Sequence, residues 1–285
     1  MSYNPASQIT NVNFASGETD AYAYDVMNRM NNYSYVLGSS SVVGIPTWSS
    51  NGTLRSLNIT DQFNPANTQN CTYSYEDLAR ISGVNCTGSV GWAQTFNYDQ
   101  FGNNTKSGSS SWLPGYNTLT NQYSGVGATY DGNGNLTFDT FNHYTWDADA
   151  NIATVNVSTS NTYDAFDQLV ETSMGPTQFL YLPNGTQPFA SMSNYRTYLK
   201  VFAPAPGGTM VITPNGKEGV IAYHRHTDWI GSSRFASTPA GTVYSDVAYA
   251  PFGEPYAPSG TTDLMFGEKC SGRFRRPRCN GRVRL

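Results

Sequence analysis

The hydrophobic and polar positions of this chain follow a recurring unit. An aromatic residue and an acid come first, then two or three variable residues, a turn residue, and an apolar residue followed by Thr or Val. One clear copy begins at Tyr130-Asp131 and continues with Gly134-Asn135 and Leu136-Thr137. From Tyr130 the next copies begin 16, 17 and 18 residues apart, which is enough for two short strands with their turns. The pattern therefore predicts one β-hairpin per repeat.

Six copies keep the aromatic–acid pair, and two degenerate copies keep the Asn-Gly turn. The pairs are Tyr24-Asp25, Tyr75-Glu76, Tyr98-Asp99, Tyr130-Asp131, Trp146-Asp147 and Tyr163-Asp164; the degenerate copies begin at Trp48, with Asn51-Gly52, and at Tyr181, with Asn184-Gly185. In each unit we expect the ring to pack inward and the acid to hydrogen-bond the backbone of the turn it opens. Gly or Asn supplies the positive φ of the reversal. Because a single hairpin is only marginally stable, neighbouring hairpins are expected to stack side by side.

The composition agrees with an all-β protein. Charged residues make up 13% of the 285 residues, about half the usual share, whereas aromatics reach 14% and include 20 Tyr. Tyr and Thr suit a pleated, half-buried surface, and Asn, Asp and Gly suit turns. A disordered low-complexity chain is the weaker interpretation, because such chains are poor in aromatics.

Charge is distributed unevenly and limits the choice of partners. Residues 1–265 carry nine basic and nineteen acidic side chains, whereas residues 266–285 carry seven basic side chains and Glu268. Nucleic acid is therefore not expected to bind the body of the protein, although the basic tail has the charge for it. No stretch has the length and apolarity of a membrane span, and Met1–Gln8 has no signal-peptide pattern, so we expect a secreted or surface-associated protein exported by another route.

The four cysteines fall into two pairs, Cys71 with Cys86 and Cys270 with Cys279. Neither pair has the spacing of a zinc site. Cys71 and Cys86 bracket one repeat, and either a disulfide or two buried thiols is compatible with that spacing.

The repeated acids are interpreted as turn formers, because each occupies the same slot of its repeat whereas a catalytic acid is normally singular. Calcium binding is the alternative for the aspartates. It is disfavoured because the tight nonapeptide spacing of calcium-binding β-rolls is absent. We therefore predict no cofactor.

The most distinctive sequence motifs lie near the C-terminal end. They consist of Tyr223-His224-Arg225-His226-Thr227-Asp228, then Gly231-Ser232, Gly241-Thr242-Val243, Tyr249 and Pro251-Phe252-Gly253-Glu254. Together with the repeats, these motifs resemble the tyrosine-aspartate (YD) repeats and the associated core of RHS proteins, over roughly residues 20–256. The resemblance implies a curved, spiralling sheet of hairpins, part of a hollow shell that in relatives encloses and delivers a C-terminal toxin. It also implies that the core residues are structural.

Two catalytic or metal hypotheses for the core segment are weaker. His224, His226 and Asp228 alternate along one predicted strand and are metal-ligand types, but in-line neighbours on a strand lie ~7 Å apart. Asp228, His226 and Ser232 contain the residue types of a hydrolase, but without a Gly-x-Ser-x-Gly elbow. We therefore predict no catalytic or metal-binding residue.

The chain departs from the RHS pattern after residue 265. Family members usually continue toward an Asp-Pro-x-Gly cleavage motif, whereas this sequence becomes rich in Arg, Pro and Cys. No protease activity is therefore expected. The tail is either a functional basic arm or the product of a reading-frame change, and we favour the frame change because the tail lacks the aromatic and Asn-Gly pattern of the preceding repeats.

These observations predict four segments: a lead-in over 1–20, YD repeats over 21–190, an RHS-associated core over 191–260 and an atypical tail over 261–285. The predicted function is a non-catalytic piece of a shell, whose partners are the remaining shell segments or a toxin cargo encoded nearby. A surface carbohydrate-binding or adhesion module, with glycans as ligands, is the alternative. Because a few hairpins leave open sheet edges, we expect the isolated chain to be sticky or to need a partner segment.

Overall fold

A computed structural model describes residues 1–125, 127–173, 177–183, 185, 187–193, 195–216 and 218–260. Within them, strands that follow one another in a sheet pair antiparallel in sequence order, so the chain forms a ribbon of successive hairpins. The ribbon divides into a first sheet, β1–β10, a short pair, β11–β12, and a last sheet, β13–β24. No helix in the described part is long and apolar enough to cross a membrane. The predicted all-β, hairpin-built fold is confirmed.

The first sheet contains β1 (Ser2–Tyr3), β2 (Ile9–Asn13), β3 (Thr19–Tyr24), β4 (Met30–Leu37), β5 (Ser40–Trp48), β6 (Leu54–Asp61), β7 (Gln69–Tyr75), β8 (Ile81–Gly88), β9 (Trp92–Tyr98) and β10 (Asn104–Gly108). The short pair is β11 (Thr129–Tyr130) and β12 (Leu136–Phe138). The last sheet contains β13 (Tyr144–Trp146), β14 (Ile152–Val155), β15 (Thr159–Tyr163), β16 (Leu169–Thr172), β17 (Thr177–Tyr181), β18 (Pro188–Ser193), β19 (Tyr198–Ala205), β20 (Gly208–Asn215), β21 (Glu218–Thr227), β22 (Ser233–Ser237), β23 (Val243–Tyr249) and β24 (Pro255–Gly260). Two 3₁₀ turns, η1 (Pro65–Asn67) and η2 (Pro251–Gly253), interrupt the ribbon.

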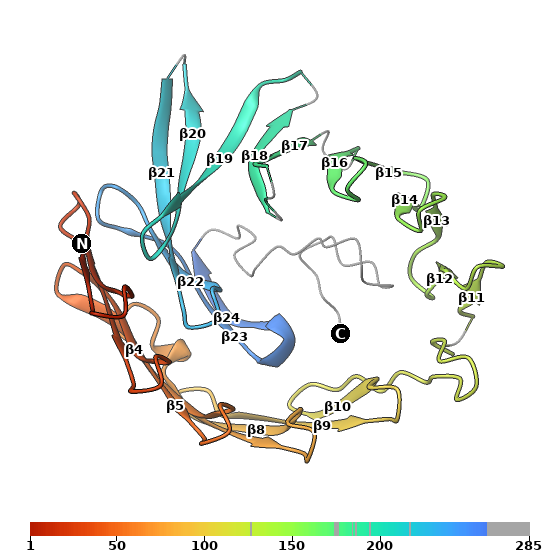
Figure 1. Ribbon diagram of the computed structural model, residues 1–285, viewed down its shortest axis with the longest axis horizontal. Coiled ribbons are helices and arrows are strands. Elements are labelled where there is room, and N and C mark those ends of the chain that lie inside the picture. The colour runs from red at the N-terminus through yellow and green to blue at the C-terminus, as the bar shows by residue number, and fades with distance from the viewer. Residues whose placement is uncertain are drawn as a thin grey trace.

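The ribbon curves through a full turn (Figure 1). The first sheet and β11–β18 form the wall of a ring, and β22–β24 lie inside it against the first sheet. The predicted lead-in joins the wall, because β1 and β2 extend the first sheet beyond β3. The predicted tail, with Cys270 and Cys279, lies outside the described residues.

The aspartates open the turns as predicted. In the turn between β9 and β10, Asp99 Oδ1 accepts the backbone N–H groups of Phe101 and Asn103, each at 2.9 Å. Asp25, Asp131, Asp147, Asp164 and Asp228 accept in the same two places, from the second and fourth residues after the acid. This arrangement satisfies backbone donors that the reversal would otherwise leave without a partner.

The residue three places after each acid adopts positive φ, as a type I turn with an adjoining bulge requires. Gly102 and Gly134 supply it without strain, at φ 82° and 83°. Ala79 and Ala150 hold the same conformation at φ 60° and 62° despite carrying a Cβ. These alanines cost the turns stability that glycine would restore.

Seven of the eight repeat aromatics share a role that the sequence did not reveal, whereas the eighth, Tyr130, donates to the carbonyl of Tyr123. Tyr98 Oη donates to the carbonyl of Ile81 at 2.8 Å, and Ile81 is the first residue of β8 in the preceding hairpin. Six further aromatics donate at 2.8–3.2 Å to the first residue of an even-numbered strand: Tyr24 to Ile9, Trp48 to Met30, Tyr75 to Leu54, Trp146 to Leu136, Tyr163 to Ile152 and Tyr181 to Leu169. We call this contact the aromatic staple. It explains why Tyr and Trp, which both donate a hydrogen bond, share the slot.

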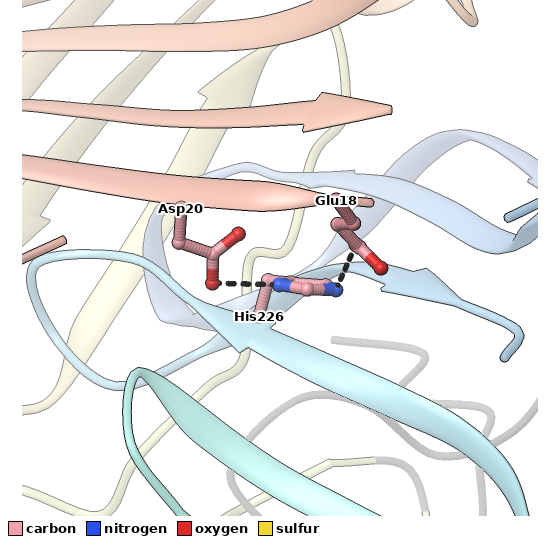
Figure 2. A group of neighbouring side chains, drawn as sticks. All are labelled: Glu18, Asp20 and His226. Atoms are coloured by element: carbon pink, nitrogen blue, oxygen red, sulfur yellow. Dashed lines mark hydrogen bonds and ion pairs between the residues drawn. The ribbon is translucent and has the colours of Figure 1, made fainter. Parts of the chain in front are cut away.

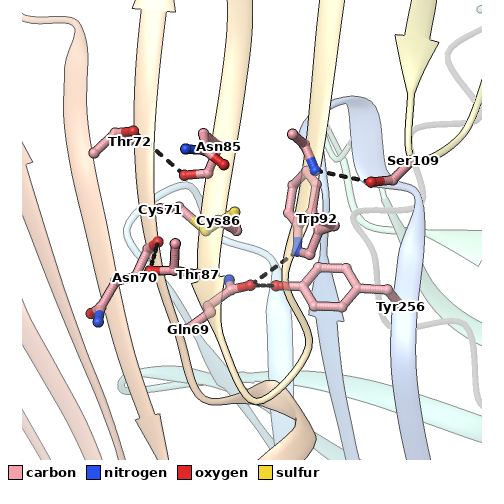
Figure 3. The surroundings of a disulfide bond; sticks show 11 residues. Gln69, Asn70, Cys71, Thr72, Asn85, Cys86, Thr87, Trp92, Ser109 and Tyr256 are labelled. Carbon is pink, nitrogen blue, oxygen red and sulfur yellow. Dashed lines mark hydrogen bonds between the residues drawn. A yellow bond between two sulfur atoms is a disulfide. The ribbon is translucent and has the colours of Figure 1, made fainter.

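Cys71 and Cys86 form a disulfide between β7 and β8 (Figure 3). They occupy directly opposed positions of the two strands, and both are buried. Beside them, Trp92 Nε1 and the Tyr256 hydroxyl both donate to Gln69 Oε1. The disulfide therefore joins adjacent strands next to the contact between the first sheet and β24.

Ala150→Gly should stabilise the protein by about 0.5–1 kcal/mol, because glycine holds positive φ without the Cβ penalty. Ala148→Gly in the same turn is the matched control, and it should destabilise by about 0.5 kcal/mol through backbone entropy alone. Urea unfolding followed by circular dichroism measures both. Equal losses of stability in the two variants would contradict the assignment of strain to residue 150.

Tyr98→Phe keeps the ring but removes the staple, and should lower the free energy of unfolding by about 1 kcal/mol. Tyr195→Phe, at a tyrosine that is 86% exposed, is the control and should change it by less than about 0.5 kcal/mol. The same urea titration compares them. An unchanged Tyr98→Phe midpoint would show that ring packing alone holds the hairpins together.

Candidate functional site at the closure of the ring

The last strands close the ring by packing on the inner face of the first sheet. Phe235 of β22 is fully buried, stacks on Tyr35 at 5.9 Å between ring centroids, and contacts Phe63 at 5.2 Å. Trp229 stacks on Tyr33 at 6.2 Å. The C-terminal strands thus cover part of the inner face of the first sheet.

A buried histidine lies at the centre of this contact (Figure 2). His226 Nδ1 is 2.8 Å from Asp20 Oδ2, and its Nε2 is 2.8 Å from both Glu18 Oε1 and Ser237 Oγ. Asp20 and Glu18 lie in and just before β3, about two hundred positions from β21. All four side chains are fully buried. We call these residues the histidine cluster.

The two carboxylates hold a proton on His226. Burial alone would lower the pKa of this histidine, but hydrogen bonds and charges from Asp20 and Glu18 raise it to about 9. Burial opposes the charge on Glu18, yet the bond and charge of His226 outweigh it and lower the pKa of Glu18. Burial raises the pKa of Asp20, which is the more deeply enclosed acid and also faces Glu18. At neutral pH the cluster contains an imidazolium between two acids.

A second buried group joins the loop after β6 to β22 and β23. Asn67 Nδ2 donates to Asp246 Oδ1 at 3.0 Å, and an Arg234 terminal nitrogen lies 3.6 Å from Asp61 Oδ2. Burial first, and then the charge and hydrogen bond of Asp61, raise the pKa of Asp246 to about 8. We call these four residues the aspartate cluster; its raised pKa keeps Asp246 mostly protonated at neutral pH.

The segment Pro251-Phe252-Gly253-Glu254 makes the third set of contacts. Lys106 Nζ, which is buried, lies 2.5 Å from Glu254 Oε2, and Gln94 Nε2 donates to the same oxygen at 3.2 Å. Phe252 and Gly253 both adopt positive φ, and this tight turn places the Phe252 ring 5.2 Å from Phe96. The segment thereby anchors η2 to β9 and β10.

The remaining core residues also make structural contacts. Tyr223 is buried and stacks on Tyr244 at 3.9 Å, and Tyr249 Oη donates to Ser233 O at 3.5 Å. Asp228 opens a turn of the repeat type, in which Gly231 supplies φ 82° and the Ser232 N–H donates to the carboxylate. Burial raises the pKa of Asp228 to about 6.

The structure does not gather His224, His226 and Asp228 into one set of metal ligands. The His224 ring contacts Phe14 at 4.9 Å, while Asp228 is used by its turn. The group that has ligand atoms within 4.8 Å in the described part of the chain is Glu18, Asp20 and His226. However, its two carboxylates face opposite ring nitrogens, so all three side chains cannot coordinate one ion in this arrangement.

The histidine cluster also has the spacing of a Ser-His-Asp triad, made by Ser237, His226 and Asp20 rather than by Ser232 and Asp228. Two observations argue against nucleophilic chemistry. Ser237 is fully buried and donates to Glu18 Oε2 at 2.8 Å, so its oxygen has no path to a substrate. In addition, an imidazole that keeps its proton at neutral pH cannot act as the base.

No family model and no curated protein matches this chain. Solved structures do match. A crystal structure of TcdB2-TccC3 superposes with a TM-score of 0.69 at 13% identity, over 91% of this chain and 16% of that chain. The chain therefore has the hairpin-built YD-repeat fold of part of that shell. TcdB2-TccC3 without its hypervariable C-terminal region gives a TM-score of 0.65 over the same shares at 13% identity. The Photorhabdus luminescens Tc holotoxin pore with mutated TccC3 gives 0.53 at 14% identity, over 89% of this chain and 17% of that chain. This YD-repeat ring thus spans about a sixth of the chains that it matches.

Asp246→Asn should flatten the pH dependence of stability between pH 4 and 8. An acid whose pKa is raised by folding stabilises the folded state most when the pH is below its pKa in the unfolded chain. For Asp246 this stabilisation is lost as the pH rises through its pKa of about 8 in the folded protein. The variant should be more stable than wild type at pH 8 by on the order of 1 kcal/mol, and the difference should shrink toward pH 4. Thermal unfolding across this range measures it, with Asp164→Asn, a turn acid, as control. A pH-independent difference would contradict the raised pKa.

Proposed function

We propose that this chain is a non-catalytic structural piece of a YD-repeat shell, of the kind that in relatives encloses and delivers a toxin. The observation that carries the proposal is the ribbon of hairpins wound through a full turn, which superposes on part of TcdB2-TccC3 over 91% of its length. A wall needs self-supporting repeats and a curved face, and the ribbon provides both.

The use of the polar side chains supports a structural role. The repeat aspartates accept turn N–H groups, and the repeat aromatics donate to the preceding hairpin. The buried acids at the closure are engaged with His226, Asn67 and Lys106. In the described residues, the acids with strongly raised pKa values, Asp228 and Asp246, are themselves enclosed in the closure. Perturbed pKa values here accompany packing rather than an open cleft.

The partners that we propose are further shell segments or a cargo encoded nearby. The test is co-expression of the full chain with the products of the neighbouring genes, followed by affinity purification and electron microscopy. A stoichiometric complex that contains a closed shell is expected. A reporter fused to the cargo should resist protease inside that complex and be digested when this chain is omitted.

A clean, cooperatively folding monomer that captures none of those products would contradict the proposal. A glycan array on the same preparation distinguishes the alternative. Selective binding of one glycan class, together with no shell complex, would identify the chain as a carbohydrate-binding module instead.

A further inference from the structure

The contact between the first sheet and β21–β24 differs from every other contact in the ring, because it contains buried ionisable groups on both sides. The wall itself is held by backbone ladders and by local turn and staple bonds. The closure adds the histidine cluster and the aspartate cluster. Their hydrogen bonds across the contact join residues about 180 to 220 positions apart in sequence. His226 and Asp246 both hold their protons at neutral pH, where an exposed histidine or aspartate would mostly have released its proton.

The opposite side of the ring has a seam at which the wall can bend. Between β10 and β13, the described residues form only the two-stranded pair β11–β12 and the isolated bridges Lys106–Trp112, Tyr116–Tyr123 and Phe138–His143. Among these described residues, no ladder connects β10 to β11 or β12 to β13. Bending at this seam would separate the closure without breaking the long sheets, as in a hinge motion.

We propose that the closure is a proton-held latch: the histidine and aspartate clusters keep β21–β24 on the first sheet, and loss of their protons at alkaline pH opens the ring at the seam. Opening would expose Tyr33 and Tyr35 on the inner face of the first sheet, together with Phe235 of β22, which packs on them. The latch thus offers a way to open a segment of shell wall while its hairpins stay folded.

The groups that face His226 come from four elements. Glu18 and Asp20 approach from β3 and the loop before it, and the Tyr22 hydroxyl donates to Asp20 Oδ2 at 3.1 Å. Ser237 approaches from β22, and the Tyr35 ring from β4 at 5.2 Å. His224, on the same strand, has a pKa lowered by burial and by the charge of His226, so it adds no competing positive charge at neutral pH.

Asp246 faces Asp61 at the end of β6, Asn67 of η1 and Arg234 of β22. Burial opposes the positive charge of Arg234, but its pKa is raised overall, with Asp246 and Asp61 among the groups that raise it, so Arg234 stays positive throughout. Asp228 lies near enough to interact with Arg234, but its pKa of about 6 places its titration below the alkaline range. Release of the Asp246 proton therefore sets two carboxylates against one guanidinium.

Both clusters act in the same direction. His226 favours the closed ring fully below its ordinary pKa of about 6.5, and this contribution is lost as pH rises to about 9. Asp246 favours closure most at low pH, and its contribution is lost as pH rises to about 8. Each group lowers the closing equilibrium constant by up to about tenfold per pH unit within its range. Glu18 sets the acid limit, since its lowered pKa favours closure above about 4.5 and less below it.

Hydrogen exchange measured by mass spectrometry on the full chain tests the latch, with rates corrected for the intrinsic effect of pH. Between pH 6.5 and 9.5, protection of β3, β4 and β21–β23 should fall at least tenfold. Protection of the hairpins β13–β18, which lie outside the closure, should stay within about twofold. Small-angle scattering on the same samples should show an increased radius of gyration without loss of strand content by circular dichroism.

Two variants separate the clusters. Asp246→Asn should weaken the pH dependence below about pH 8, where only the contribution of His226 remains, and leave that between 8 and 9 unchanged. The triple change Glu18→Gln, Asp20→Asn and His226→Gln replaces the ion trio with amides and should remove the upper range. Asp164→Asn, in the turn after β15, is the control and should behave as wild type. If the triple variant does not fold, wild type between pH 8 and 9.5 and Asp246→Asn still test the proposal.

Three results would overturn it: unchanged protection of β3 and β21–β23 at pH 9.5, an equal loss in β13–β18, or full pH dependence in Asp246→Asn. None of them bears on whether the chain joins a larger shell, so the two proposals fail separately.

Discussion

The ring depends first on the aromatic staple, the hydrogen bond that the Tyr or Trp of seven repeats donates to the preceding hairpin. A turn aspartate stabilises only its own reversal, so a chain of such turns alone would be a series of marginal hairpins. The staple joins one hairpin to the next at the same end of each, where the even-numbered strand begins and a bulge shifts the register. Because the contact repeats with nearly constant geometry, it propagates order along the ribbon much as nearest-neighbour interfaces do in solenoids.

The staple works over a short range, whereas the closure works over a long one. Each staple spans between 10 and 21 residues of sequence, but His226 and Asp20 are 206 residues apart. Loop-closure entropy grows only slowly with length, so the longer loop is not prohibitive. What the closure requires is a buried face that recognises one partner. Tyr33, Tyr35, Val42 and Leu57 supply the apolar area of that face.

The sequence predicted what lies within one repeat, because the acid, the turn residue and the apolar residue that follow one another are neighbours in space as well. Strand order followed from the hairpins, and the core motif lies in the segment that closes the ring. The closure itself was not predicted. Nothing near His226 in the sequence indicates Glu18, and the alternation that suggested His224 and Asp228 as companions ignores the turn that takes Asp228 away. One signal was present, since Asp20 and Tyr22 alternate on the inward side of β3, where an acid needs a buried partner.

Buried charge at the closure is costly, and a purely apolar interface of the same size would be at least as stable. An apolar sheet face, however, accepts its partner in several registers two residues apart, since each shift of two keeps the same side chains inward. Here Asp20, Asn67 and Lys106 lie on successive parts of the first sheet and meet His226, Asp246 and Glu254 in the order in which those residues follow along the chain. A shift by two residues would leave all of these groups buried without partners, at a cost of several kcal/mol. The polar groups therefore select one register of docking. Because the same groups carry the protons that balance their charges, selectivity and sensitivity to pH arise from the same contacts.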